Sequence, residues 1–197
     1  AGRPLSIEVF AGNTSDPKTV ASQVKKIVGH FGGGAVTFVG DRGMLKIPQI
    51  EHLSEHGMHY ITAITKPQIE SLLNTKVLQM ELFDQPLAEV GEEEVRYILR
   101  RNPKRAAEMD ATRAHKLGRL EHKVNESNAY LSAHPRAKAQ TVLTTLSKEV
   151  QKLKLQSWVE VKCGQTRCVA LQIDEAARNE QAKLDGCYVL KTDLSAG

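Results

Sequence analysis

The stretch AVTFVGDRGM, residues 35–44, places an acid and a base side by side after an apolar run. Residues 35–39 are apolar or β-branched, which is typical of a strand buried on both faces, and Gly40 ends the run. A carboxylate at Asp41, held at the carboxyl end of a strand, could bind Mg²⁺, which prefers oxygen ligands. Because one carboxylate cannot build a metal site, a turn residue paired with Arg42 is the plainer alternative.

A second group with ligand-like spacing is HLSEHGMH, residues 52–59. It matches the H-x-x-E-H spacing that some zinc proteases use, and on a helix His52 and His56 would share one face. The predicted helix is short and ends at Gly57, and motifs of this length match by chance. We therefore expect these histidines to lie on a solvated helix surface rather than to bind zinc.

The composition of the chain bounds its function loosely. Of 197 residues, 41% are hydrophobic and 5% aromatic, so a core can form, but a surface that stacks bases on aromatic rings is not expected. The net charge of +4 permits a nucleic-acid partner without requiring one. Three cysteines without CxxC spacing favour a reducing cytoplasm over a disulfide framework or a zinc motif. No apolar run approaches the roughly 20 residues that span a bilayer.

A basic segment lies in the middle of the chain. Residues 96–123 carry nine lysines and arginines against three acids, a local net charge of +6. Contact with phosphate groups is one interpretation, since cations neutralise the backbone of nucleic acids. A solvated helix with ion pairs at i, i+4 spacing is the other, and the charge pattern leaves both open.

Residues 1–75 alternate between strand-like and helix-like segments. An alternation of the form β-α-β-α-β-α predicts a mostly parallel sheet with helices on its faces. Chemistry in such sheets gathers at the carboxyl ends of the strands, which is where Asp41 is expected. The predicted segments are strands 4–10, 35–39 and 60–64 and helices 16–28, 47–56 and 66–74.

A helical hairpin is predicted further along. From Pro103 the apolar residues follow the spacing of a coiled coil, His134-Pro135 interrupts the helix, and a second apolar seam follows, so two antiparallel helices are expected. The seam residues are Leu117, Leu120, Val124 and Leu131, then Leu143, Leu146, Val150 and Leu153. The other predicted segments are strands 78–83 and 95–99, a strand hairpin at 158–162 and 167–173, a short helix after Asp174, and a last strand at 187–191.

Five separated blocks carry a family resemblance: GRPLSIEVFAGNTSDPKTV, VTFVGDRGM, HYITAITK, RYILRRNPKRA and DGCYVLKTD. In this order they resemble the DDE transposases of bacterial insertion sequences. The resemblance implies an α/β fold, with an RNase H-like mixed sheet and flanking helices that a helical-hairpin insertion interrupts. It also implies three carboxylates that bind two Mg²⁺ (or Mn²⁺) ions and cut and join DNA strands.

The resemblance assigns the site residue by residue. Asp41 matches the family's second catalytic aspartate, a metal ligand, and Arg42 matches its usual neighbour. The first aspartate would precede residue 1 and the glutamate would follow residue 197, so we expect a fragment that is inactive alone. Asp16, Asp185 and Asp193 match no catalytic position.

The implied partner is double-stranded DNA, as transposon ends and target, with self-association in an active complex and no cofactor besides the metal. We expect part of the core at 1–83, a basic and helical insertion at 84–156, and a return to the core at 157–197. A non-catalytic DNA-binding or regulatory protein derived from a transposase, or an oligomerisation module, are the alternatives. The expected DNA-binding residues are Arg42, Arg100, Arg101, Lys104 and Arg105.

Overall fold

A computed structural model describes residues 7–31, 36–42, 44–164 and 167–195, without the side chains of residues 16, 17 and 31. The chain divides into two units: unit 1 comprises residues 1–101 and 188–197, and unit 2 comprises residues 102–187. Unit 2 is therefore inserted into the chain of unit 1. The functional division into core, insertion and return segment stays a prediction.

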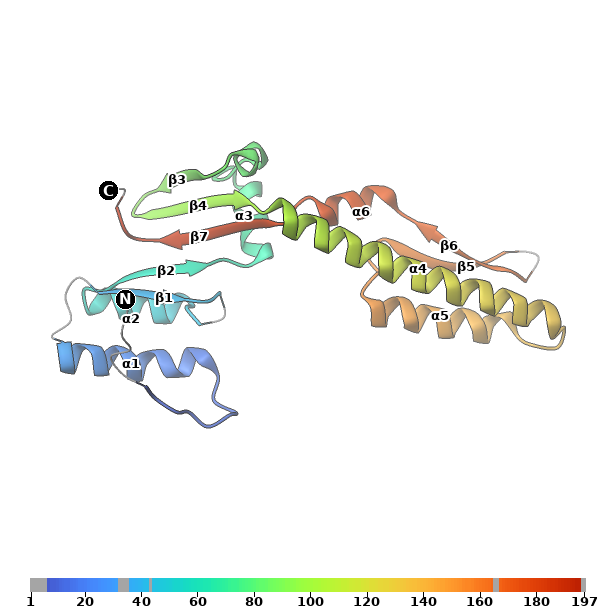
Figure 1. Cartoon of the computed structure of the whole chain (residues 1–197), viewed down its shortest axis with the longest axis horizontal. Helices are drawn as coiled ribbons and strands as arrows, with labels where there is room; N and C mark the ends of the chain where they lie inside the picture. The colour runs from blue at the N-terminus through green and yellow to red at the C-terminus, as the bar shows by residue number, and fades with distance from the viewer. Residues whose placement is uncertain (1–6, 32–35, 43, 165–166, 196–197) are drawn as a thin grey trace. The chain divides into compact units, whose positions relative to one another are not determined.

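A five-stranded mixed sheet lies in unit 1 (Figure 1), and its strands are β1 (Thr37–Gly40), β2 (His59–Ala63), β3 (Ala88–Glu92), β4 (Val95–Arg101) and β7 (Cys187–Thr192). Their order across the sheet is β1-β2-β7-β4-β3. β1 and β2 are parallel, whereas β7 is antiparallel to β2 and β3 is antiparallel to β4. The mixed sheet implied by the resemblance is thus confirmed. The mostly parallel sheet predicted from the alternation is wrong, because a late strand and a hairpin supply antiparallel neighbours.

Three helices accompany these strands: α1 (Asp16–Phe31), α2 (Ile47–Glu55) and α3 (Lys66–Asn74). Val24 of α1 and Leu53 of α2 are buried in one apolar cluster with Tyr60 of β2. Both α2 and α3 begin with a proline in the first turn, where the missing N–H needs no partner. A glutamine at the third position of each, Gln49 and Gln68, accepts a hydrogen bond from the capping residue's N–H. The three predicted helices are confirmed.

The first predicted strand is wrong over its described part. Residues 7–10 form no strand, and Ile7 and Val9 are 83% and 90% exposed. Alternating apolar and polar residues favour a strand only where a neighbouring strand forms hydrogen bonds with it and one face becomes buried. No described strand pairs with residues 7–10.

Two further strand predictions change. Residues 78–83 overlap a 3₁₀ helix, η1 (Met80–Asp84), and the strand that pairs with β4 is β3. The strand β1 is confirmed but is not buried on both faces, because it stands at the sheet edge and Val39 is 72% exposed.

Unit 2 contains the predicted helical hairpin and a two-stranded sheet: α4 (Pro103–Ala133), α5 (Ala139–Leu153), β5 (Val159–Cys163), β6 (Val169–Ile173) and α6 (Glu175–Ala182). The two long helices run side by side in opposite directions (Figure 1). Six seam residues are buried in one core, with Leu117 and Leu143 partly buried against it. Asn102 and Asp174 cap α4 and α6 by accepting hydrogen bonds from backbone N–H groups. The hairpin, the strand pair and the short helix are confirmed.

Candidate functional site

Asp41 lies directly after β1, at the carboxyl end of the strand, and its side chain is exposed. Its Oδ1 atom accepts the backbone N–H of Arg42 at 2.7 Å. Its carbonyl oxygen accepts the N–H of Met44 at 2.9 Å and the hydroxyl of the buried Thr62 on β2 at 3.4 Å. The backbone is therefore held by a turn and by the neighbouring strand, while the carboxylate faces solvent.

The glycine before this aspartate has a steric reason. A Cβ atom at Gly40 would lie 2.8 Å from Cγ of Leu45 and 3.0 Å from its Cδ1. Leu45 is 5% exposed and belongs to the apolar cluster that α1, α2 and β2 share. Gly40 thus lets the chain fold back over the strand end, which sets the position of Asp41.

The surroundings of Asp41 fit one ligand of a magnesium ion and not a whole site. Mg²⁺ keeps several waters and is usually bound by one or two carboxylates together with substrate phosphates. Asp41 belongs to no group of three ligand side chains among the residues that the structure describes. Any complete site needs carboxylates besides this one.

The predicted DNA contacts fall in three places. Arg42 is exposed beside Asp41. Arg100 and Arg101 end β4 in unit 1, and the Arg101 Nε atom lies 3.9 Å from a carboxylate oxygen of Asp84. Lys104 and Arg105 lie in the first turn of α4, in unit 2, both exposed; these two residues and the two on β4 are neighbours in sequence.

The first turn of α4 carries these cations and no acid. A helix N-terminus has a partial positive charge, so cations there are unfavourable unless an anion joins them. Arg105 Nη1 lies 3.0 Å from Glu108 Oε2, yet the two side chains are 64% and 49% exposed, and such pairs are weak. The turn is therefore suited to a phosphate group.

A second group of cations lies further along α4. A hollow of about 470 Å³ is lined by Arg119 and Lys123 with two histidines, a glycine and one glutamate. Both cations approach Glu149 of α5, at 4.0 Å and 2.8 Å, and the hydrogen bond from Lys123 lowers the pKa of that carboxyl. Glu126 in the hollow and Glu149 beside it thus balance the charges of Arg119 and Lys123, so the hollow is less suited to phosphate than the first turn of α4.

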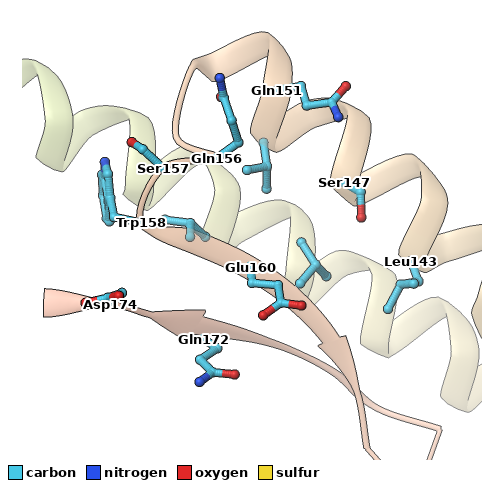
Figure 2. A pocket seen from close by; sticks show the side chains of 12 residues that line it. Leu143, Ser147, Gln151, Gln156, Ser157, Trp158, Glu160, Gln172 and Asp174 are labelled. Carbon is cyan, nitrogen blue, oxygen red and sulfur yellow. The ribbon is translucent and has the colours of Figure 1, made fainter. Parts of the chain in front are cut away.

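Another pocket in unit 2 has a different character (Figure 2). It has a volume of about 580 Å³ and lies between α5 and the strands β5 and β6. Ser147 and Gln151 of α5, Glu160 and Asp174 are among its lining residues, which include no lysine or arginine. Two carboxylates and no cation make this pocket unsuited to phosphate.

The aspartates that match no catalytic position have structural contacts where their side chains are described. Asp193 accepts the N–H of Tyr60 at 2.9 Å and lies 3.2 Å from His59 Nδ1, so it joins the end of β7 to β2. Asp185 pairs with Arg113 of α4 within unit 2. The side chain of Asp16 lies outside the described residues. No local sequence pattern predicts these contacts, because their partners lie far apart in the chain, although an Asp-Gly dipeptide such as Asp185-Gly186 is typical of a turn.

A family model described as Transposase DDE domain matches residues 1–175 of the chain. The chain belongs to this family. No curated protein and no solved structure matches it. Membership agrees with the mixed sheet and flanking helices of an RNase H-like domain, which confirms the predicted fold class. Transposases of this family act on DNA and generally use divalent metal ions.

None of the helices described here could cross a membrane.

Proposed function

We propose that this chain is the central part of a cut-and-paste transposase of a bacterial insertion sequence, in which Asp41 is one ligand of the catalytic Mg²⁺ ions. The observation that carries the proposal is a solvent-facing carboxylate at the carboxyl end of β1, on a backbone held by Thr62 and Met44. Two such ions activate a water and stabilise the leaving oxygen in phosphodiester cleavage. The other carboxylates of the metal site would be supplied by the longer protein that the family resemblance implies.

The residues of this chain contribute position and charge. Asp41 is proposed to hold the metal, and Arg42 to contact a DNA phosphate or steady that carboxylate. Arg100 and Lys104 are proposed to contact the DNA backbone, and neither forms an ion pair within the described part of the chain. Such contacts position the duplex without reading its bases. Arg101 and Arg105 are proposed to join them, although each lies near a carboxylate, of Asp84 and Glu108 respectively.

Substituting Asp41 tests the catalytic assignment. In a chain that also carries the upstream aspartate and downstream glutamate, Asp41→Asn should abolish Mg²⁺-dependent strand cleavage and leave DNA binding intact. Glu81→Gln, the same change at an exposed carboxylate of unit 1, is the matched control and should cleave normally. Cleavage retained by Asp41→Asn would sink the assignment.

A non-catalytic DNA-binding or regulatory protein is the second candidate. It is supported by the absence of Asp41 from every three-ligand group in the described residues. A native reading frame without the two flanking carboxylates, together with DNA binding by this chain, would favour it over the transposase. Self-association and a cytoplasmic location stay predictions.

A further inference from the structure

Three potential metal ligands converge at the carboxyl-terminal end of α2. His52, Glu55 and His56 each offer one ligand atom, and these atoms all lie within 4.8 Å of one another. The two imidazole rings have centroids 4.5 Å apart, and Nδ1 of His52 lies 3.5 Å from Oε2 of Glu55. The H-x-x-E-H spacing therefore brings all three side chains to one place, because i, i+3 and i, i+4 positions share a helix face.

The hydrogen bonding of the histidines leaves a nitrogen for a ligand. Nδ1 of His56 lies 2.8 Å from the carbonyl oxygen of His52. A carbonyl oxygen only accepts, so Nδ1 of His56 is the donor and its Nε2 is the unprotonated atom of the neutral ring. Metal-bound histidines commonly make this kind of second contact, which fixes the ring orientation. Nε2 of His52 is buried without a hydrogen-bond partner among the described residues, so Nδ1, which lies beside Glu55, is the atom of this ring offered to a metal.

The helix end favours a cation here. His52 lies in the last turn of α2, and Gly57, with φ of +66°, ends the helix. The unpaired carbonyl groups of a last turn carry a partial negative charge, which stabilises positive charge nearby. The side chain of His52 is 25% exposed, so this histidine is not on the fully solvated surface that the sequence led us to expect.

The cluster lies away from Asp41. β1 and β2 are parallel, with Gly40 opposite Thr62 at their carboxyl ends and Thr37 opposite His59 at their amino ends. Asp41 follows the carboxyl end of β1, whereas His56 comes shortly before the amino end of β2. The helix α2 connects the carboxyl end of β1 to the amino end of β2, so Asp41 and the cluster lie at opposite ends of these strands.

We propose that His52, Glu55 and His56 form a binding site for a divalent transition metal ion such as Zn²⁺, with water completing the shell. Imidazole and carboxylate ligands suit zinc, whereas Mg²⁺ prefers oxygen ligands alone. Ligand atoms around one tetrahedral zinc lie about 3.4 Å apart, so binding requires side-chain movements of roughly 1 Å. Glu55 is 71% exposed and is free of packing that would prevent this movement. By bridging these three side chains, the ion would stabilise the end of α2, and this role is separate from the DNA cleavage proposed above.

Isothermal titration of the 197-residue chain with ZnCl₂ tests the site. Exposed thiols can also bind zinc, so the experiment uses a chain in which the exposed Cys163 and Cys168 are both changed to serine. One Zn²⁺ should bind per chain and raise the midpoint of thermal unfolding. His56→Gln should weaken binding at least tenfold, and Glu55→Gln severalfold, while excess Mg²⁺ should not compete.

His122→Gln is the matched control. His122 lies 3.5 Å from Glu126 on α4, both side chains are exposed, and they belong to no three-ligand group within the described part of the chain. This variant should bind Zn²⁺ as the parent does. Absence of binding in the Cys163→Ser, Cys168→Ser chain, or equal affinity after His52→Gln and His56→Gln, would overturn the proposal. Because Glu55 is largely exposed, Glu55→Gln gives a decisive result even if a histidine variant fails to fold.

Discussion

Arg113 on α4 is hydrogen-bonded through its guanidinium to the carboxylate of Asp185, which lies 72 positions later in the turn before β7. Their side chains are only 12% and 7% exposed. The hydrogen bond from Arg113 to Asp185 raises the pKa of the guanidinium further, so the arginine is charged at every working pH. This contact joins the first half of α4 to the last turn of unit 2.

Removing either partner of this ion pair should destabilise unit 2. Arg113→Met removes the cation from a carboxylate that is only 7% exposed, and such losses cost about 3 kcal/mol. Asp185→Asn should cost less, because Arg113 Nη2 also lies 3.3 Å from Oδ1 of Asp110. Urea unfolding of both variants and of the double variant measures the coupling, and the double variant should lose less than the sum. Arg105→Met, which breaks the exposed pair with Glu108, should change the free energy of unfolding by less than about 1 kcal/mol. Equal effects of the buried and exposed changes would contradict this ranking.

Gly186 should tolerate no side chain. Its φ is +70°, and a Cβ atom there would overlap the carbonyl oxygen of Asn102 and lie 3.1 Å from the backbone nitrogen of Ala106. Gly186→Ala should therefore cost more than the roughly 1–2 kcal/mol of left-handed strain alone. Gly57→Ala is the control, since Gly57 has φ of +66° and nothing within 4 Å of its Cβ position. Chemical unfolding should separate the two variants, and equal losses would show that the contact with α4 is unimportant.

The hairpin core should respond to cavity formation. Leu120 is fully buried in the cluster between α4, α5 and the strand pair, so Leu120→Ala should cost about 2–5 kcal/mol. Leu87 is 57% exposed, and Leu87→Ala should cost far less. Thermal unfolding followed by circular dichroism measures the stability of both variants. A small effect of Leu120→Ala would argue against the burial of Leu120 between α4 and α5.

Alkaline pH should weaken the fold through Tyr60. Burial, and then the charge of Asp193, raise the pKa of Tyr60 to about 12 from 10.0. The unfolded chain releases this proton first, so stability is full below pH 10 and falls as pH rises towards 12, by up to about 3 kcal/mol. Urea unfolding across this range should show the fall, and Tyr60→Phe should remove its share of it.

DNA binding should lose salt dependence when the cations at the end of β4 and the start of α4 are neutralised. Each phosphate contact contributes about 0.9 to the slope of log affinity against log salt, so four lost contacts should lower the slope by roughly 3 to 4. Fluorescence anisotropy with duplex DNA measures the slope, and Lys162→Gln, at an exposed lysine of β5, is the control. An unchanged slope in the fourfold variant would refute the assignment. The four changes are Arg100→Gln, Arg101→Gln, Lys104→Gln and Arg105→Gln.

Local patterns predicted most helices and the later strands correctly. Pro103 and the apolar spacing through Leu131 located α4, and Asp174 located the start of α6. Such signals act within a few residues of one another, so they survive without knowledge of the fold. The same local reading failed at residues 7–10 and 78–83, because strand formation depends on a partner that sequence spacing does not specify.

By itself the sequence determined the family, through the order of five separated blocks. It also determined the helical hairpin and the placement of Asp41 after a strand, since these depend on spacing between residues close together in the chain. Tertiary structure alone decided that β7 lies between β2 and β4, and that Val39 is exposed on an edge strand. It also decided that Arg113 meets Asp185, because pairing between distant residues follows from how the elements pack.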